Sequence, residues 1–186
     1  MYKIENVSIT SCEQSEFIAP KRIVYHQEGI KKSWDMVEVH DSVAVLLYHT
    51  EKEAFVLVKQ FRPPVYVRNG DGFTHELVAG IVDKELTLEQ IVQEEIEEEV
   101  GYHVPLEKIE YLTSFFSAVG FAGSQQHLYF ANVDASMQVS EGGGIDIEAI
   151  EVYYLPKKES LTWAMDATIV KTPALLFALQ WYIASQ

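Results

Sequence analysis

A chain of 186 residues, 48% of them hydrophobic, is long enough for one well-buried core and has the usual size of a single domain with room for a small appendage. Acidic residues outnumber basic ones by 28 to 14, and the formal net charge of −14 would repel a phosphate backbone, so no nucleic-acid partner is expected. The single cysteine, Cys12, excludes an intramolecular disulfide framework, and no apolar run approaches membrane-spanning length. We therefore expect a soluble, cytoplasmic protein without a membrane partner.

The N-terminal part of the chain predicts a β-hairpin, because strand-forming segments at 22–26 and 33–39 flank a Glu28-Gly29 turn. Thr172 followed by Pro173 predicts the N-cap and first turn of a C-terminal helix. Further strands are expected at 42–48, 54–61, 74–78, 109–116, 127–133 and 150–155, with a loop after Pro63-Pro64. The first two of these look like the start of a mixed core sheet.

The segment from Thr87 to Gly101 predicts a well-delimited helix. Thr87 is a good N-cap and Gly101 a good C-terminal stop. Apolar residues recur between them at helical spacing, namely Leu88, Ile91, Val92 and Ile96. The helix therefore has one buried face.

Five glutamates, Glu94, Glu95, Glu97, Glu98 and Glu99, cluster in the second half of this helix. At ~100° per residue, Glu95 and Glu99 project onto the apolar face and Glu98 onto its edge, whereas Glu94 and Glu97 point away. Carboxylates at these spacings repel one another, and near a helix C-terminus they also oppose the macrodipole. Burying them costs roughly several kcal/mol per unpaired ion, which a hard cation such as Mg²⁺ or Mn²⁺ can offset.

A solvated surface is the ordinary interpretation of a Glu-rich helix, and we adopt it for Glu94 and Glu97. For the other three glutamates the same interpretation would turn the apolar face into solvent as well. We therefore expect a divalent metal site at Glu95, Glu98 and Glu99.

The stretch from Gly80 to Tyr102 resembles the Nudix box. The pattern of that box is Gly, five residues, Glu, seven residues, Arg-Glu, an aliphatic residue, any residue, Glu-Glu, any residue, Gly and an apolar residue. The positions in register are Gly80, Glu95, Ile96, Glu98, Glu99 and Gly101. The resemblance implies that Glu95, Glu98 and Glu99 ligate Mg²⁺ or Mn²⁺, and that the Ala79 carbonyl is a further ligand.

Two positions of the box depart from the pattern. Leu86 stands in place of the first Glu, and Glu94 in place of the Arg that orients the neighbouring glutamates in the family. Glu85 or Glu89 could partly replace the missing first acid. The group of three metal-ligating glutamates is intact, which favours catalysis.

Outside the box, the resemblance narrows to the UDP-sugar and ADP-ribose diphosphatases, especially the branch that hydrolyses UDP-glucose. The segments that carry it are 32–35, 40–43, 58–63, 76–80, 119–124 and 142–144. ADP-ribose specialists carry a Ser-Pro-Gly signature near 117–120, where this chain reads Ser-Ala-Val-Gly. The expected substrate is therefore a small-molecule nucleotide sugar.

The fold that the resemblance implies is α/β (α+β), an α/β/α sandwich around a mixed β-sheet with a small N-terminal antiparallel sheet. Residues 1–40 would form the small sheet and help to build a homodimer, and residues 41–186 would form the Nudix hydrolase domain.

The implied reaction is attack of water on one phosphorus of the diphosphate, which yields a nucleoside monophosphate and a sugar phosphate. Bound metal would neutralise the diphosphate, lower the pKa of a bound water and align the reacting oxygens, and Glu98 would be catalytic as well as a ligand. The general base is expected on a loop beyond the box, as Asp146 or Glu148, unless both are merely solvated loop acids. Glycines 142–144 precede them and would allow the loop to close over substrate.

Arg62 follows an apolar strand, and its planar fork suits a phosphate or a sugar hydroxyl, although a surface salt bridge is the alternative. Glu76 is assigned with it to substrate binding. Two other functions stay open. The chain could be a noncatalytic nucleotide-sugar sensor, because Leu86 and Glu94 weaken the box, or it could hydrolyse another nucleoside diphosphate derivative.

Overall fold

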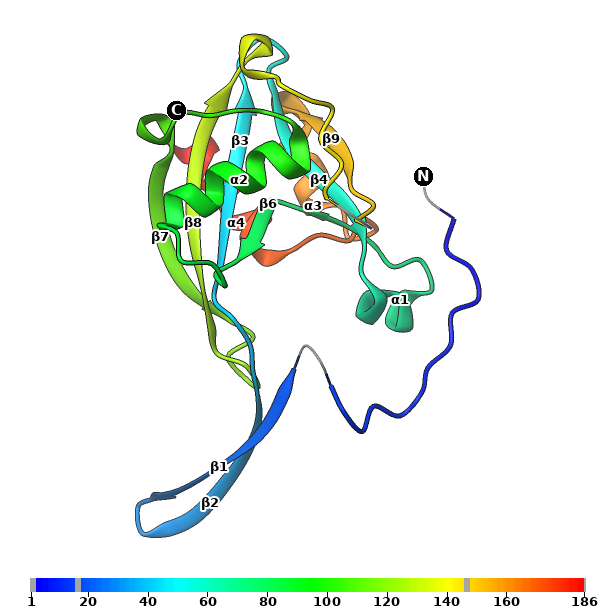
Figure 1. Ribbon diagram of the computed structural model, residues 1–186, viewed down its shortest axis with the longest axis vertical. Coiled ribbons are helices and arrows are strands. Elements are labelled where there is room, and N and C mark those ends of the chain that lie inside the picture. The colour runs from blue at the N-terminus through cyan, green and yellow to red at the C-terminus, as the bar shows by residue number, and fades with distance from the viewer. Residues whose placement is uncertain (1–2, 16–17, 146–147, 186) are drawn as a thin grey trace.

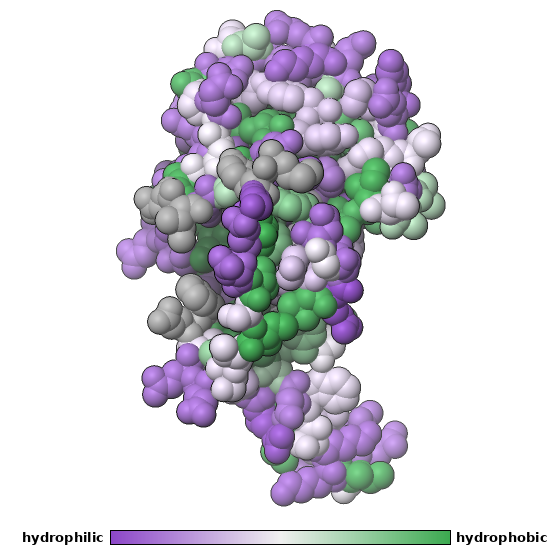
Figure 2. All heavy atoms as spheres, turned by 90° about the vertical axis from the view of Figure 1, so that its right-hand side faces the viewer, coloured by the Kyte–Doolittle hydropathy of each residue, from purple (hydrophilic) through white to green (hydrophobic). Residues whose placement is uncertain are grey.

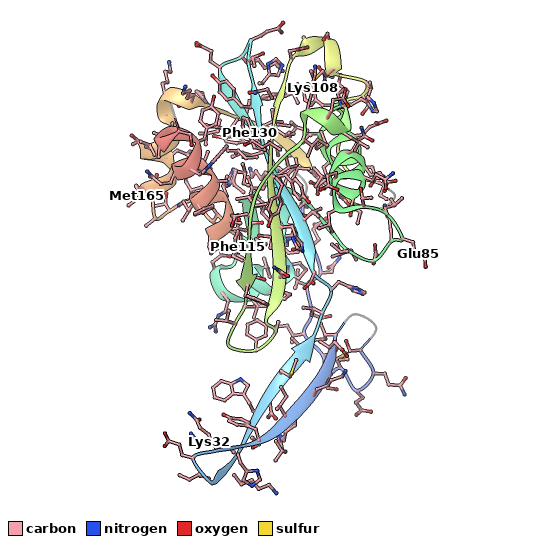
Figure 3. All side chains as sticks on the ribbon, turned by 90° about the vertical axis from the view of Figure 1, so that its left-hand side faces the viewer. Lys32, Glu85, Lys108, Phe115, Phe130 and Met165 are labelled. Atoms are coloured by element: carbon pink, nitrogen blue, oxygen red, sulfur yellow. The ribbon has the colours of Figure 1, made fainter. Side chains whose placement is uncertain are left out.

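The body of the protein is a sandwich of three layers, with a mixed β-sheet between two layers of helices (Figure 1). The computed structural model describes residues 3–15, 18–145 and 148–185. Helix α2 (Leu88–Val100) packs on one face of the sheet, and α3 (Ser160–Met165) and α4 (Pro173–Ala184) pack on the other (Figure 3). The fold class implied by the sequence is confirmed.

Seven strands of the described ranges form the main sheet, in the order β5-β4-β3-β8-β7, with β6 beside β3 and β9 beside β4. Strands β3 and β8 are parallel, and the other pairs are antiparallel. The strands are β3 (Ser42–His49), β4 (Ala54–Phe61), β5 (Phe73–Glu76), β6 (Val78–Ile81), β7 (Glu110–Ser117), β8 (Ser124–Val133) and β9 (Glu151–Pro156). Short 3-10 helices follow at η1 (Leu106–Lys108), η2 (Ala135–Met137) and η3 (Lys157–Glu159).

Strand β3 changes its antiparallel partner along its length. Its residues 42–45 pair with β6, and its residues 47–49 pair with β4, whose far end pairs with β5. Because β5 and β6 follow each other in the chain, the backbone crosses from one branch of the sheet to the other at Leu77. Glu76 and Ala79 lie on either side of this crossing.

The core follows from strict alternation along β3. Val43, Val45 and Leu47 belong to the apolar cluster under α2, whereas Ala44 and Leu46 belong to the cluster under α4. A strand buried on both faces reads as a continuous apolar run, since successive side chains point to opposite sides. Among the residues that the structure describes, the sheet lies between these two apolar clusters.

Helix α2 begins and ends where the sequence predicts. The Thr87 hydroxyl accepts a hydrogen bond from Gln90 N at 3.3 Å, and the Gln90 side chain accepts one from Thr87 N at 2.9 Å, which completes a capping box. Gly101 takes a left-handed conformation, with φ of 77°, and its N–H donates to Glu97 O at 3.1 Å.

The segment after Pro63-Pro64 is a short helix, α1 (Pro63–Asn69), where the sequence predicts a loop. The two prolines occupy the first helical turn, in which a backbone N–H has no helical partner to lose. Gly70, with φ of 75°, ends the helix after less than two turns of ordinary length. The two prolines therefore start a helix at a place where the sequence predicts a loop.

Strands β1 (Ala19–Gln27) and β2 (Ile30–Glu38) form the expected antiparallel hairpin, which projects away from the body (Figure 1). All of β1 is exposed. Near its base the hairpin is attached to the loop between β7 and β8, where Trp34 Nε1 donates to Gly120 O at 2.8 Å and Val37 N to Phe121 O at 2.8 Å. Figure 2 shows apolar surface gathered where the hairpin meets the body.

Helices of the described residues are all too short or too polar to cross a membrane.

Replacing Ile96, which is fully buried between α2 and the sheet, tests the core directly. Ile96→Ala should lower the free energy of unfolding by about 2–5 kcal/mol, measured by urea denaturation, because it leaves a cavity. Leu176→Ala, at a side chain 36% exposed on α4, should lower it by much less. Equal losses would contradict this packing.

Candidate functional site

Helix α2 presents its carboxylates to the sheet in the predicted order. Glu99 is only 5% exposed, Glu95 and Glu98 are half-buried, and Glu97 is exposed. Glu94 is half-buried rather than turned fully outward, since its carboxylate pairs with Lys84. The helical projection is thus confirmed for the buried carboxylates and for Glu97.

The backbone of β6 receives these carboxylates. Ala79 N donates to Glu99 Oε2 at 3.1 Å. A Cβ atom at Gly80 would lie 2.1 Å from Glu95 Oε1, so the carboxylate of Glu95 packs directly against the bare backbone of that glycine. The glycine of the box therefore permits the close approach of this side chain in its present conformation, and its φ is not unusual.

The register of β3 and β6 also fixes the direction of the Ala79 carbonyl. Val82 N donates to Asp41 O at 2.9 Å, and in an antiparallel ladder hydrogen-bonded pairs alternate, so Gly80 is bonded to Val43 and Ala79 is not bonded to Ala44. The N–H and C=O of one strand residue point to the same side. The Ala79 carbonyl therefore points away from β3, as does the N–H that meets Glu99.

The carboxylates of this cluster resist ionisation. Burial raises the pKa of Glu99 to about 8 against the lowering effect of the Ala79 N–H, and the charges of Glu95, Glu148 and Glu76 raise it further. Burial, followed by the charge of Glu98, raises the pKa of Glu95 to about 7. Negative charge accumulates here without enough positive charge to balance it.

A divalent cation fits this set of groups. Carboxylate oxygens and a backbone carbonyl are the ligands that hard cations prefer, and such a cation would compensate the buried charge. Within residues 3–15, 18–145 and 148–185, no three acidic, histidine or cysteine side chains already converge as a ligand set. Ligation by all three glutamates thus requires side-chain rotation, and Glu95 and Glu98 are only half-buried.

Arg62 and Glu76 form a two-pronged ion pair beside the cluster. Arg62 Nε and Nη2 each lie 2.9 Å from a Glu76 carboxylate oxygen, and the Thr74 hydroxyl donates to the same carboxylate. Burial raises the pKa of Glu76, but the hydrogen bonds and charge of Arg62 outweigh it, and the net pKa lies below the usual range. Both sequence-predicted residues are therefore brought together, with two of the five Arg62 N–H donors used by Glu76.

A cleft of about 440 Å³ opens on the α4 side of the sheet and reaches Glu76 and Ala79. Its apolar wall includes Phe115 and Phe116 of β7, and the start of α4 at Thr172 closes one end. Figure 3 shows Phe115 beside α4. Sequence reasoning missed these cleft residues, because aromatic residues in a strand and a capped helix start are also what an ordinary core contains.

The glycine-rich loop is bonded to the end of α2. Gly143 N donates to Glu99 O at 2.9 Å, and Gly144 N to Glu98 O at 3.0 Å. A Cβ atom at Gly142, whose φ is 67°, would lie 2.5 Å from Glu99 O. The glycines expected to permit loop closure therefore serve here for close docking onto the helix that carries the metal-ligating candidates.

Of the two candidate bases, Glu148 lies near the cluster, since its charge raises the pKa values of both Glu95 and Glu99. Its Oε2 accepts a hydrogen bond from Ile145 N at 3.1 Å. Asp146 lies outside the described residues.

Neither acid considered as a replacement for the missing first box Glu joins the cluster. Glu89 Oε1 accepts a hydrogen bond from the Tyr129 hydroxyl at 3.3 Å, and Glu85 is exposed on the loop before α2 (Figure 3).

Comparison with known proteins identifies residues 38–167 with the NUDIX domain. A uridine diphosphate glucose pyrophosphatase, NUDT14 of Bos taurus, is 33% identical over 99% of this chain and 96% of its own length. The corresponding protein of Mus musculus is 32% identical with the same coverage. A GDP-mannose pyrophosphatase of Cronobacter sakazakii is 36% identical over 82% of this chain and 80% of its own length.

The raised pKa values predict how stability depends on pH. Glu99 and Glu95 have pKa values of about 8 and 7 in the folded protein, whereas the reference value for the unfolded chain is 4.5. Between the reference pKa and the raised pKa of each carboxylate, the folded state therefore binds more protons than the unfolded chain. Without divalent metal, stability should fall as pH rises from 5 to 8, which is measurable as thermal midpoints in EDTA. Glu99→Gln should flatten this decline. Parallel curves for the variant and the wild type would contradict the assignment.

Proposed function

The chain belongs to the Nudix family, and on that premise we propose that it hydrolyses the diphosphate bond of a nucleoside diphosphate sugar at a divalent metal site on α2. The observation that carries the proposal is the pair of buried Glu99 and half-buried Glu95, held against the backbone of Ala79 and Gly80, where Ala79 also lines a cleft of about 440 Å³ on the other side of the sheet. A charged cluster of this kind beside a cavity is characteristic of a functional site.

The residues that would hold the metal are Glu95, Glu98 and Glu99, with the Ala79 carbonyl. When bound, Mg²⁺, or Mn²⁺ in its place, supplies charge neutralisation for the diphosphate and activation of water. Glu98 lies on the exposed edge of the cluster, where it can turn toward both ion and substrate. The direction of the Ala79 carbonyl supports its inclusion.

Hydrolysis adds one water across a phosphoanhydride. An oxygen–phosphorus bond forms from the water, the bond from that phosphorus to the bridging oxygen breaks, and the products are a nucleoside monophosphate and a sugar phosphate. A base must take a proton from the attacking water. Glu148 is supported by its nearness to Glu95 and Glu99, and Asp146 of the same loop stays the other candidate.

Substrate binding is assigned to Arg62, Glu76 and the cleft. Glu76 fixes the guanidinium plane and leaves further N–H donors for a phosphate oxygen or a sugar hydroxyl. The cleft walls Phe115 and Phe116 suit a flat base or a sugar face. UDP-glucose is the favoured substrate because the mammalian relatives match over 99% of the chain, with GDP-mannose and ADP-ribose as comparisons.

The partner of the hairpin is proposed to be a second copy of the chain. Cross-strand pairing puts Ile23, Tyr25, Ile30, Trp34 and Met36 on one face of the hairpin. A two-stranded hairpin with an exposed apolar face is marginally stable by itself, and burial of that face in a homodimer would stabilise it.

Incubation of the purified protein with Mg²⁺ and UDP-glucose, GDP-mannose, ADP-ribose or a dinucleoside polyphosphate tests the activity, with products identified by mass spectrometry. A nucleoside monophosphate and a sugar phosphate should appear, and EDTA should abolish them. Glu98→Gln should reduce turnover by about 100-fold or more, because even partners of metal ligands contribute about 10–100-fold. Glu97→Gln, on the same helix but exposed, is the matched control. Saturable binding without turnover would instead support a sensor.

Light scattering coupled to size-exclusion chromatography tests the homodimer. Ile23→Glu places a charge on the apolar face of the hairpin and should give a monomer. Val24→Glu places the same charge on the opposite face and should leave the dimer intact. A monomeric wild type, or equal behaviour of both variants, would refute this interface.

A further inference from the structure

Lys84 lies on the loop between β6 and α2 and is held against the acidic side of the helix. Its Nζ is 2.7 Å from Glu94 Oε2, and the two side chains are 43% and 42% exposed. Loop and helix are thus joined by an ion pair between residues ten positions apart. No motif identifies this contact in the sequence.

The position of Glu94 brings the ammonium group close to two metal-ligating candidates. Glu94 directly precedes Glu95, and it lies one helical turn from Glu98, which is the spacing of neighbours on a helix surface. The charges of Glu98 and Glu95 both raise the pKa of Lys84, after the hydrogen bond from its ammonium to Glu94, which contributes most. In return, Lys84 favours the ionised form of Glu95.

A cation at this position compensates for a positive charge that helix α2 lacks. Glu94 stands where the Nudix box has an arginine, so the helix carries one more negative charge and lacks a positive one. Arg62 is already engaged by buried Glu76 on the other side of the cluster. Anchored by Glu94, Lys84 supplies positive charge from the loop instead of from the helix.

We propose that Lys84 is the counter-charge of the carboxylate site, a positioning residue that offsets the repulsion between Glu95 and Glu98 and thereby sets how tightly the site binds a divalent cation. The inference rests on the proposed metal site and deepens it. In this proposal Glu94 holds the ammonium group of Lys84 near the site, and does not only add a further negative charge to it.

The alternative is an ordinary surface ion pair that fastens the loop to the helix. Half-exposed pairs of that kind contribute about 0–1 kcal/mol to stability. Loss of either partner would then have the same small effect, with no consequence for metal. A counter-charge predicts effects of opposite sign for the two partners, because one carries positive and the other negative charge near the ion.

Binding of Mn²⁺, measured by titration with electron paramagnetic resonance detection, gives a readout independent of hydrolysis. Lys84→Met should tighten Mn²⁺ binding by about three- to tenfold, because a competing positive charge is lost. Glu94→Gln should weaken it by a similar factor, and Lys84→Arg should match the wild type. Lys158→Met removes the same charge from another lysine paired with an acid, on η3, and should leave affinity unchanged.

Thermal unfolding provides a second readout. Without metal, Lys84→Met should unfold at a lower temperature than the wild type, whereas saturating Mg²⁺ should reduce the difference, since the bound ion then supplies the missing charge. If Lys84→Met, Glu94→Gln and the wild type bind Mn²⁺ with equal affinity, and Mg²⁺ raises their unfolding temperatures equally, the proposed role of Lys84 is wrong. The proposed metal site would still stand. If the wild type binds no Mn²⁺, the metal site itself fails.

Discussion

Burial of two carboxylates against the backbone of β6 is the constraint on which the rest of the site depends. Glu99 is 5% exposed and Glu95 is half-buried, although neither has a cation of its own at bonding distance among the described residues. One backbone N–H, from Ala79, is the direct support that Glu99 receives. This arrangement is unfavourable for the metal-free protein, and it is stable only because the surrounding core holds helix and strand in place.

The sheet is built so that this juxtaposition can occur. Strand β3 leaves β4 for β6 along its length, and the crossing at Leu77 sets Glu76 and Ala79 on different branches. Helix α2 then lies over β6 with its apolar side on the core, which forces the carboxylates at the same helical phase toward Gly80. The cleft on the opposite side of the sheet reaches Glu76 and Ala79 at this crossing, so the proposed substrate-binding and metal-ligating residues approach the same strands from its two faces.

Sequence patterns foresee what is local and periodic. Thr87 and Gly101 bound α2 because capping depends on residues a few positions apart, and a 3.6-residue period sorts exposed Glu97 from buried Glu99.

Contacts between distant segments leave no such trace in the sequence. The pairs Lys84 with Glu94 and Arg62 with Glu76 join different elements, and each arises from packing that one sequence does not encode as a pattern. Position 94 is instructive, since the isolated helix would place it in solvent, whereas the neighbouring loop draws it into a pair. The prolines of α1 mislead for a related reason, because their meaning changes between a helix interior and a first turn.

The docking of the glycine-rich loop onto α2 limits how far the candidate base Glu148 can move. Gly143 and Gly144 are bonded to the end of α2, and Ile150 N donates to Gly143 O at 3.2 Å, so Ile150 is held against the same glycines that dock on the helix. One residue separates Glu148 from Ile150, so the backbone of Glu148 lies within roughly 7 Å of that bonded residue. The general base would therefore travel only within a short radius of the metal-ligating helix. A change in the length of this loop would then alter the reach of the Glu148 carboxylate without any change in the candidate metal ligands themselves.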